Sequence, residues 1–478
     1  AFYLTFGTHS LSDTVSEHYS WGVSMSLSSR AKRYRLRLST IGCLALLISV
    51  AGATQGATYT WTGAVSSDFT EAGNWSGGNV ANTGTTEASR ISVQNGSNAP
   101  LLYTATQGTT IYEGDGSGRA LFIASGDDGA MSMTGGTFDS RGNSRDGISN
   151  GGEGSLTIDG GNYININGGS STFLVKFGGS GTATLGVHSG SFTVGELRFG
   201  DSASSGGTGI VNLDGGTLTA NIIRKGPEGT SAVNATFNFN GGALVAGASS
   251  TTFLEGLNLA NVRDGGAVID TNGNDITIGQ ALLHSAISND AGTDGGLTKT
   301  GAGTLTLSGA NTYTGVTIIS EGTLKMGNDA ALGTADGKTI VQSGATLDIA
   351  GFKAGLVAES AIGNELIEVS GSGVGGLGAL VNTGATQTKA VGSITLLDDT
   401  TFGGTGRWDL RYGAFAVGGH TITKVGANTV SIVSATVTNP GDVNVNAGVF
   451  RFEGSTNYNA ATPVTIAVAS GARLDYWG

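Results

Sequence analysis

A six-residue pattern that returns at nearly constant steps limits the fold of this chain more than any other feature. It reads apolar, polar, Gly or Ser, Gly, small, apolar, and it occurs at residues 133–138, 158–163, 187–192, 213–218 and 239–244. The second glycines are residues 136, 161, 190, 216 and 242, so the steps are 25, 29, 26 and 26 residues. A fixed period of this size indicates a solenoid, in which each repeat packs mainly on its neighbours.

Each period contains two or three runs of strand length, such as residues 209–213, 216–220 and 221–223. The chain has 84 Gly but only 4 Pro, which together with aliphatic alternation favours short strands and tight turns over disorder. We therefore predict an all-β fold, a right-handed parallel β-helix with the Gly-Gly pairs at corners. An antiparallel propeller is the alternative, but its blades need about 40 residues each.

A second motif occupies residues 297–333, where strands are expected at 304–307 and 316–319. It resembles the autotransporter-associated β-strand repeat, found in secreted β-helical passenger regions of Gram-negative bacteria. The residues that define the resemblance are Lys299, Gly301, Gly303, Asn311, Tyr313, Gly315, Gly322 and Leu324. Residues 422–454 repeat parts of this motif, with Lys424 and Gly448 in place of Lys299 and Gly322, and are interpreted as a degenerate second copy.

Near the N-terminus, basic residues 30–37 precede the apolar run 41–50, and both follow Met25. This order is typical of a secretory signal peptide, and the apolar run is too short for a membrane span of about 20 residues. We expect export to the extracellular space or to the outer-membrane surface of a Gram-negative-type bacterium. The resemblance implies a C-terminal anchor that this sequence does not contain, so we expect it to be a fragment of a longer chain.

The predicted organisation has seven parts. They are an upstream, disordered segment (1–24), a signal peptide (25–53), an N-terminal cap with the first coils (54–130), Gly-Gly-corner repeats (131–296), the autotransporter-associated repeat (297–333), further coils with an irregular segment at 350–400 (334–421), and the degenerate copy with the final coils (422–478).

The charge balance restricts the partners of this chain. Its 36 acidic and 24 basic residues give a formal net charge of −12, and no Lys/Arg patch is evident beyond the signal peptide. We therefore expect no nucleic-acid partner, and membrane anchoring only through a segment missing from this chain. The single cysteine, Cys43, lies within the signal peptide, so the mature chain has no disulfide. We expect a monomer.

Candidate metal ligands do not form a recognisable site in the sequence. Residues 270–275 alternate oxygen ligands as a calcium loop does, but they lack its central glycine and its final glutamate, and an Asx-rich turn fits better. We therefore predict no metal site and no cofactor. Neighbouring acids such as Asp127 and Asp128, or Asp398 and Asp399, would point to opposite faces if they lay on strands, which argues against a catalytic pair of carboxylates.

No catalytic residues are predicted either. The histidines of the mature chain, His188, His284 and His420, lie far apart in the sequence, and His188 occupies the repeat position taken elsewhere by Asp159 and Asp214. We predict a secreted or cell-surface scaffold that is not an enzyme and that has a possible role in adhesion.

Two alternatives remain open, a carbohydrate-binding adhesin and a β-helical polysaccharide lyase or glycosidase. The adhesin would bind an extracellular glycan or surface matrix through exposed aromatic side chains, namely Trp61, Trp75, Trp408 and Tyr412. The first two of these are better explained as a hydrophobic plug on the first coil. The enzyme would need acids or basic residues that converge in one groove.

Overall fold

The structure is a computed structural model, and it describes residues 58–478 except 79, 82–85, 88–89, 113–119, 142–145, 150, 167–170, 227–230, 356–362 and 459–462. The predicted upstream segment, the signal peptide and Cys43 lie outside the described residues. All described residues belong to the second of two units into which the chain divides, residues 53–478.

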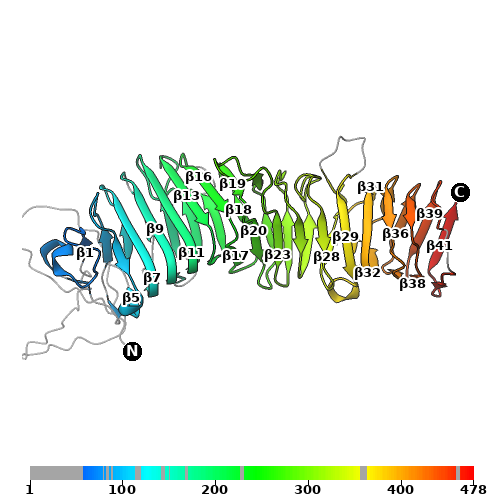
Figure 1. Cartoon of the computed structure of the whole chain (residues 1–478), viewed down its shortest axis with the longest axis horizontal. Helices are drawn as coiled ribbons and strands as arrows, with labels where there is room; N and C mark the ends of the chain where they lie inside the picture. Colours follow the sequence, from blue (N-terminus) through cyan, green and yellow to red (C-terminus); the bar gives the residue numbers. More distant parts are fainter. Residues whose placement is uncertain are drawn as a thin grey trace, which may run out of the picture. The chain divides into compact units, whose positions relative to one another are not determined.

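The second unit is an all-β parallel solenoid, as predicted (Figure 1). The described residues contain no α-helix, only the short 3₁₀ turns η1 (Ala72–Asn74), η2 (Ser76–Gly78), η3 (Ala105–Gln107) and η6 (Val374–Gly376). None of its helices is long or apolar enough to cross a membrane. Each strand pairs in parallel with the strand one coil further along the chain, so the coils stack in sequence order.

One ladder of parallel strands continues through the whole described unit. It consists of β1 (Thr58–Trp61), β3 (Arg90–Val93), β6 (Leu121–Ile123), β8 (Asp146–Ile148), β10 (Thr172–Lys176), β12 (Glu196–Phe199), β15 (Ile222–Lys225), β18 (Ser250–Glu255), β21 (Ile276–Ile278), β24 (Thr304–Leu307), β26 (Thr323–Met326), β28 (Thr346–Asp348), β30 (Leu380–Asn382), the end of β32 (Ser393–Gly404), β35 (Ile422–Lys424), β38 (Val443–Val445) and β40 (Ile466–Val468).

A second ladder forms another face of the coils. It consists of β2 (Thr86–Glu87), β5 (Thr109–Tyr112), the ends of β7 (Gly129–Ser140), β9 (Gly154–Asn165) and β11 (Thr182–Val194), then β14 (Thr217–Ala220), β17 (Ala243–Ala246), β20 (Ala267–Asp270), β23 (Leu297–Thr300), β25 (Thr317–Ile319), β27 (Thr339–Val341), β29 (Leu366–Gly371), the start of β32, β34 (Ala414–Ala416) and β37 (Thr436–Thr438).

The third face changes its strands along the chain. In the N-terminal half it is formed by β4 (Leu101–Tyr103), the starts of β7, β9 and β11, β13 (Thr208–Leu213), β16 (Asn234–Phe239), β19 (Leu259–Val262) and β22 (Leu283–His284). In the C-terminal part a separate five-stranded sheet is formed by β31 (Gln387–Val391), β33 (Trp408–Arg411), β36 (Thr429–Val433), β39 (Val449–Glu453) and β41 (Arg473–Trp477).

Alternation along each strand places one set of side chains inside the coil and the other set outside. The inner set repeats at each level, so like side chains stack on one another. Tyr112, Phe138, Tyr163 and Phe192 form such a stack, with successive ring centroids 4.6, 5.7 and 4.6 Å apart. A column of this kind buries apolar surface without a wide core, which suits a chain with 38% hydrophobic residues.

The Gly-Gly pairs lie at corners, as the sequence predicted. Gly161 has φ +74°, and a Cβ placed on it would come within 2.6 Å of the backbone of Gly135 in the preceding coil. Gly190 and Gly216 have φ values of +74° and +59°, and a Cβ on them would lie 2.3 and 2.9 Å from the backbone of the coil before them. Only glycine meets both demands, a left-handed backbone and close contact between coils, which explains why the pattern recurs.

Candidate functional site

The motif at residues 297–333 is organised around a lysine that points into the coil. Lys299, on β23, is fully buried. Its Nζ donates hydrogen bonds to the carbonyl oxygens of Thr300 (2.8 Å), Gly301 (2.6 Å) and Glu321 (3.1 Å) and to Oγ1 of Thr271 (2.8 Å). Burial lowers the pKa of Lys299 to about 8, although nearby carboxylates oppose this shift. An ammonium group has three hydrogens, so these four acceptors share them.

The degenerate copy has the same arrangement around Lys424, which is also fully buried. Its Nζ donates to the carbonyl oxygens of Val425 (2.6 Å), Gly426 (2.9 Å) and Ala447 (3.3 Å). Burial lowers its pKa to about 8 as well. The two motifs therefore share one structural feature. In each, a buried lysine donates hydrogen bonds to carbonyl groups in the turns of two successive coils.

Four of the other repeat-defining residues lie close to Lys299. Gly301 and Gly303, with φ +73° and +97°, form the turn after β23, and Gly322, with φ +67°, packs against it from the next coil. A Cβ on Gly322 would lie 2.9 Å from Nζ of Lys299 and 2.5 Å from the carbonyl oxygen of Gly303. Leu324, two residues further, is buried in β26. These residues therefore leave the lysine just enough space.

The remaining repeat-defining residues lie away from this corner. Asn311 is buried and links two coils, because its Oδ1 accepts from the amide of Leu282 (2.9 Å) and its Nδ2 donates to the carbonyl of Ala331 (2.7 Å). The hydroxyl of Tyr313 lies 2.7 Å from Oγ1 of Thr317. Gly315 packs directly on the backbone of Asp294. Each of these residues positions backbone, and none is accessible for chemistry.

A buried carboxyl group, which the sequence analysis did not single out, lies in the same interior. Glu365 is fully buried, and its Oε1 accepts from Oγ1 of Thr339 at 2.9 Å, while its Oε2 has no partner among the described residues. Burial raises the pKa of Glu365 to about 8, against the effect of the hydrogen bond from Thr339. The group is therefore neutral in the folded coil at neutral pH.

The histidines are dispersed over the coils, as expected. His188 lies in line with Asp159 and Asp214, with Nδ1–Oδ1 and Nε2–Oδ2 distances of 2.7 and 3.5 Å, so each ring nitrogen faces a carboxylate of a different coil. His284 pairs with Asp294 at 2.8 Å. Oγ1 of Thr314 lies 3.3 Å from Nδ1 of His284, the same nitrogen that faces Asp294, so hydroxyl and carboxylate are not on opposite sides of the ring as in a catalytic triad. We find no Ser–His–Asp geometry in the described part of the chain.

The expectation for Asp398 and Asp399 was wrong. Their carboxylates and the ring of His420 lie within 4.8 Å of one another. The reason is that β32 spans two faces, pairing with β29 through residues 393–396 and with β35 through residues 400–402, so residues 397–399 form the corner between them. Strict alternation does not hold at a corner. The two carboxylates are exposed, and an exposed acidic cluster does not by itself define a site.

Residues 270–275 form the expected Asx-rich turn. Oδ1 of Asp270 accepts from the amide of Asn272 at 2.7 Å, and Oδ1 of Asp275 accepts from the amide of Thr304 at 2.8 Å. Asn272 has a left-handed backbone with φ +49°. These side-chain oxygens thus serve the turn and the next coil.

The tryptophans proposed for sugar stacking are not available at the surface. Trp61 and Trp408 are fully buried, and Trp75 is 3% exposed. Trp75 packs edge-on against Trp61 and Phe69, with centroids 5.2 and 5.1 Å apart, inside the first coils. That part of the carbohydrate hypothesis is wrong, because these rings lie on the inner face. Tyr412, 64% exposed, is the exception.

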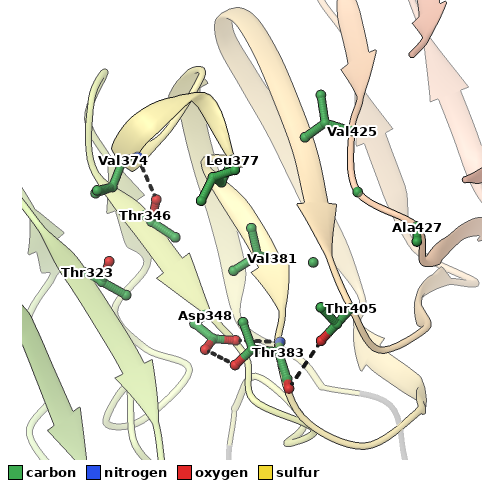
Figure 2. A pocket seen from close by; sticks show the side chains of 12 residues that line it. Thr323, Thr346, Asp348, Val374, Leu377, Val381, Thr383, Thr405, Val425 and Ala427 are labelled. Atoms are coloured by element: carbon green, nitrogen blue, oxygen red, sulfur yellow. Dashed lines mark hydrogen bonds between the residues drawn. The ribbon is translucent and has the colours of Figure 1, made fainter. Parts of the chain in front are cut away.

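One side of the solenoid is hollowed by a groove of about 410 Å³ (Figure 2). Residues 372–379, which contain η6, overhang β28 and β30, and Val374 and Leu377 of this segment face Val381. The floor is largely apolar and is bounded by threonines. Its lining consists of Thr323, Thr346, Asp348, Val374, Leu377, Val381, Thr383, Gly404, Thr405, Val425, Gly426 and Ala427.

The only carboxylate in this lining is already engaged. Oδ1 of Asp348 accepts from the amides of Ala350 (2.9 Å) and Thr383 (3.0 Å), and Oδ2 binds the hydroxyl of Thr383 and lies 3.7 Å from Nζ of Lys325. A glycosidase needs two carboxyl groups that flank the bond to be cut. The groove can hold an apolar group, but it does not contain an acid–base pair.

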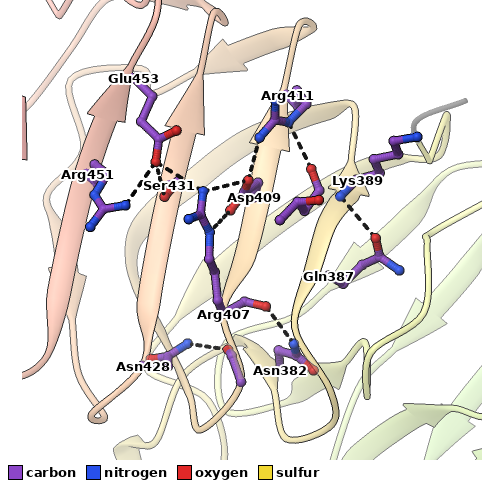
Figure 3. A network of polar contacts seen from close by, with 12 residues as sticks. Asn382, Gln387, Lys389, Arg407, Asp409, Arg411, Asn428, Ser431, Arg451 and Glu453 are labelled. Atoms are coloured by element: carbon purple, nitrogen blue, oxygen red, sulfur yellow. Dashed lines mark hydrogen bonds and ion pairs between the residues drawn. The ribbon is translucent and has the colours of Figure 1, made fainter. Parts of the chain in front are cut away.

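The second surface feature is a network of arginines and acids on the outer face of the C-terminal five-stranded sheet (Figure 3). Asp409, whose side chain is fully covered, binds Arg407 through two contacts of 2.8 and 3.0 Å and Arg411 through one of 2.8 Å. Glu453 accepts from Arg407 at 3.0 Å and from Arg451 at 3.2 Å. The network extends across β33, β39 and β41.

The sequence analysis found no basic patch, because these arginines are scattered between residues 407 and 473 and only the coil register brings them together. A signal was nevertheless present. Arg407 and Asp409, Arg451 and Glu453, and Arg473 and Asp475 share an Arg–x–acid spacing, which places both charges on one face of a strand.

Comparison with known proteins agrees with the solenoid. Residues 297–326 match the family described as Passenger-associated-transport-repeat. The chain carries a passenger-associated transport repeat. The matched stretch begins at β23 and ends with β26, so it contains Lys299 and the corner that encloses it.

A relative is the protein named Adhesin BmaC autotransporter, from Brucella suis biovar 1 (strain 1330). It is 38% identical over 136 residues, which cover 27% of this chain but only 4% of that adhesin. The chain thus corresponds to a small part of the relative's length. No solved structure matches the chain.

Proposed function

We propose that this protein is a cell-surface passenger, a non-catalytic β-solenoid that is exported and contributes to adhesion. The observation that carries the proposal is the transport repeat at 297–326, which lies inside an uninterrupted parallel ladder. The 38% identity over 136 residues to a protein named an adhesin supports the same proposal. The rigid ladder would hold binding surfaces away from the cell.

The absence of an acid–base pair in the groove favours presentation over polysaccharide cleavage. The groove instead offers apolar contact area, with Leu377 71% exposed at its rim. Apolar area of this kind, rimmed by polar residues, is typical of sites that bind another molecule. We propose the groove as one adhesive contact.

Surface exposure is tested by adding proteinase K to intact cells that express the full gene product, with a periplasmic protein as the control. We expect the solenoid to be degraded while the control survives. Protection of both proteins would contradict export to the surface.

Adhesion is tested with beads coated with the purified chain and applied to epithelial cells and extracellular matrix. We expect saturable attachment that soluble chain competes away. Leu377→Asp should weaken attachment through the groove, whereas Leu397→Asp, at an exposed corner outside the groove, should not. Attachment no better than that of albumin-coated beads would overturn the adhesive role.

A further inference from the structure

The outer face of the C-terminal sheet has a charge balance opposite to that of the whole chain. The chain carries a net charge of −12, yet on this face basic side chains outnumber acidic ones. The basic residues are Lys389, Arg407, Arg411, Arg451 and Arg473, and the acids are Asp409, Glu453 and Asp475. We call this surface the arginine face.

Two of the three carboxylates of the arginine face, those of Asp409 and Asp475, are less exposed than the arginines that they bind, whereas Glu453 is 18% exposed beside Arg451 at 12%. The side chains of Asp409 and Asp475 are 0% and 10% exposed, whereas those of Arg407 and Arg473 are 27% and 63% exposed. Solvent therefore meets mainly positive charge. Although burial alone would raise the pKa of Glu453, its hydrogen bonds and the charges of neighbouring arginines lower it, so this acid stays ionised and keeps the arginines in place.

The arginines are held in position but retain free donors. Arg411 uses Nη2 for Asp409 and Nε for the carbonyl of Thr388 (2.9 Å), while Arg407 uses Nε and Nη2. Nη1 of Arg407 has no acceptor among the described residues, whereas Arg411 makes a further side-chain hydrogen bond with Tyr412. Guanidinium groups fixed by carboxylates behind them lose little entropy when they bind an anion in front.

Exposed aromatic rings accompany the arginines. The guanidinium carbon of Arg411 lies 5.7 Å from the ring centre of Tyr412, and that of Arg451 lies 4.1 Å from the ring centre of Trp477. Tyr412 and Trp477 are 64% and 56% exposed. From β33 to β41 there are three strand steps, or about 14 Å, so the two pairs suit an extended ligand better than a single small ion.

We propose that the arginine face binds an acidic polysaccharide, whose sulfate or carboxylate groups pair with the guanidinium groups and whose sugar rings lie on Tyr412 and Trp477. Charge complementarity selects an anionic ligand, and ring faces beside the cations select sugars. The rest of the chain is acidic and repels polyanions elsewhere, so binding of an anionic polymer would be confined to the arginine face. This inference rests on the proposed surface location, where such polymers occur.

The test uses the purified chain on surfaces bearing heparin, polygalacturonate or neutral dextran. We expect binding to heparin or polygalacturonate that weakens as salt rises, and none to dextran. The double variant Arg411→Gln with Arg473→Gln should reduce affinity at least about tenfold. It removes the cation beside Tyr412 and the arginine of this face that is 63% exposed. The matched control, Arg224→Gln with Arg263→Gln, removes the same charge from arginines on other faces and should change affinity less than about twofold.

Several outcomes would overturn the proposal. These are equal loss in both double variants, no binding to either acidic polymer, or duplex DNA that competes as well as heparin, which would indicate simple cation exchange. Circular dichroism and thermal unfolding of each variant show whether the coils are intact. Tyr412→Ala, at an exposed position, provides a second variant that leaves the arginine network in place and should weaken binding.

Because this assay uses no cells, its failure is distinct from failure of the proposed adhesive function. Loss of polymer binding with intact bead attachment would reject only the arginine face. Polymer binding without bead attachment would reject only adhesion.

Discussion

The repeat at 297–326 and its copy at 422–454 use the same inward lysine, but the coil that precedes each of them differs. In the first, Thr271 accepts from Lys299 and can donate its own hydrogen to the carbonyl of Ala302 at 2.6 Å. β20 and β23 pair Ile269 with Lys299, so Thr271 lies two residues beyond the partner of the lysine.

In the second, Phe402 pairs with Lys424, and the residue two positions further is Gly404, which has no side chain. The carbonyls around Lys424 have no other donor among the described residues. Around Lys299, the carbonyl of Thr300 also accepts from the amide of Thr271 (3.1 Å) and that of Ala302 from the amide of Gly273 (2.8 Å), so the single hydroxyl hydrogen of Thr271 can serve Gly301 when the lysine is absent. The comparison shows that the motif determines the position of the lysine. The preceding coil determines how many carbonyl groups have the lysine as their only donor, and hence how much the lysine contributes to stability.

The largest expected effect is a difference in the stability lost when each of the two lysines is replaced. Lys424→Met leaves three carbonyls without a donor and should lower the free energy of unfolding by about 3 kcal/mol, whereas Lys299→Met leaves only that of Glu321 and should cost about 1 kcal/mol. Hydrogen exchange read coil by coil, alongside denaturant unfolding, measures each change locally. Equal costs would show that the preceding coil contributes nothing.

Glu365, which lies between the two repeats, should make the stability of the chain depend on pH between about 4.5 and 8. Its pKa is about 8 when folded against 4.5 for the ordinary group, so the folded state binds more protons between these values and stability falls as pH rises through this range. Glu365→Gln abolishes that fall and should stabilise the chain by about 2 kcal/mol at pH 8, with no gain near pH 4.5.

Thermal and denaturant unfolding across this pH range tests the effect of Glu365. Glu368→Gln, whose carboxylate pairs with Lys338 on the outer face, is the matched control and should not reproduce the gain. A gain of the same size at both pH values would show that titration is not its cause.

The smallest effect is expected for Thr271→Val, which removes the hydroxyl and makes the first lysine resemble the second. Alone it should cost about 1 kcal/mol, the usual value of one hydrogen bond. Combined with Lys299→Met it should approach the cost of Lys424→Met. Strict additivity of the two single changes would mean that the hydroxyl and the lysine do not share their acceptors.

The sequence predicted those features that are fixed within one coil. The period of the Gly-Gly corners, the parallel solenoid and the correspondence of Lys299 with Lys424 all follow from local spacing and from the backbone freedom of glycine. The repeat period also placed His188 in line with Asp159 and Asp214.

Features assembled between coils could not be predicted in this way. Thr271, the groove below Leu377 and the arginine face depend on the register of strands that lie 20 to 35 residues apart. The adhesin alternative placed Trp408 at the surface on chemistry alone, without a strand register to show which side it faces, whereas Trp61 and Trp75 are buried as the plug interpretation predicted. Alternation failed at Asp398 and Asp399 because a corner interrupts the strand.

The continuous ladder also determines how the molecule would respond to tension. Its hydrogen bonds run from coil to coil, so a pull on the two ends loads one set of bonds at a time and peels off single coils. Each coil of about 25 residues would release roughly 85 Å of chain, and a molecule under flow would extend in steps while the remaining coils stay folded. Force–extension records should show such steps, and release of the whole stack in one event would contradict this picture.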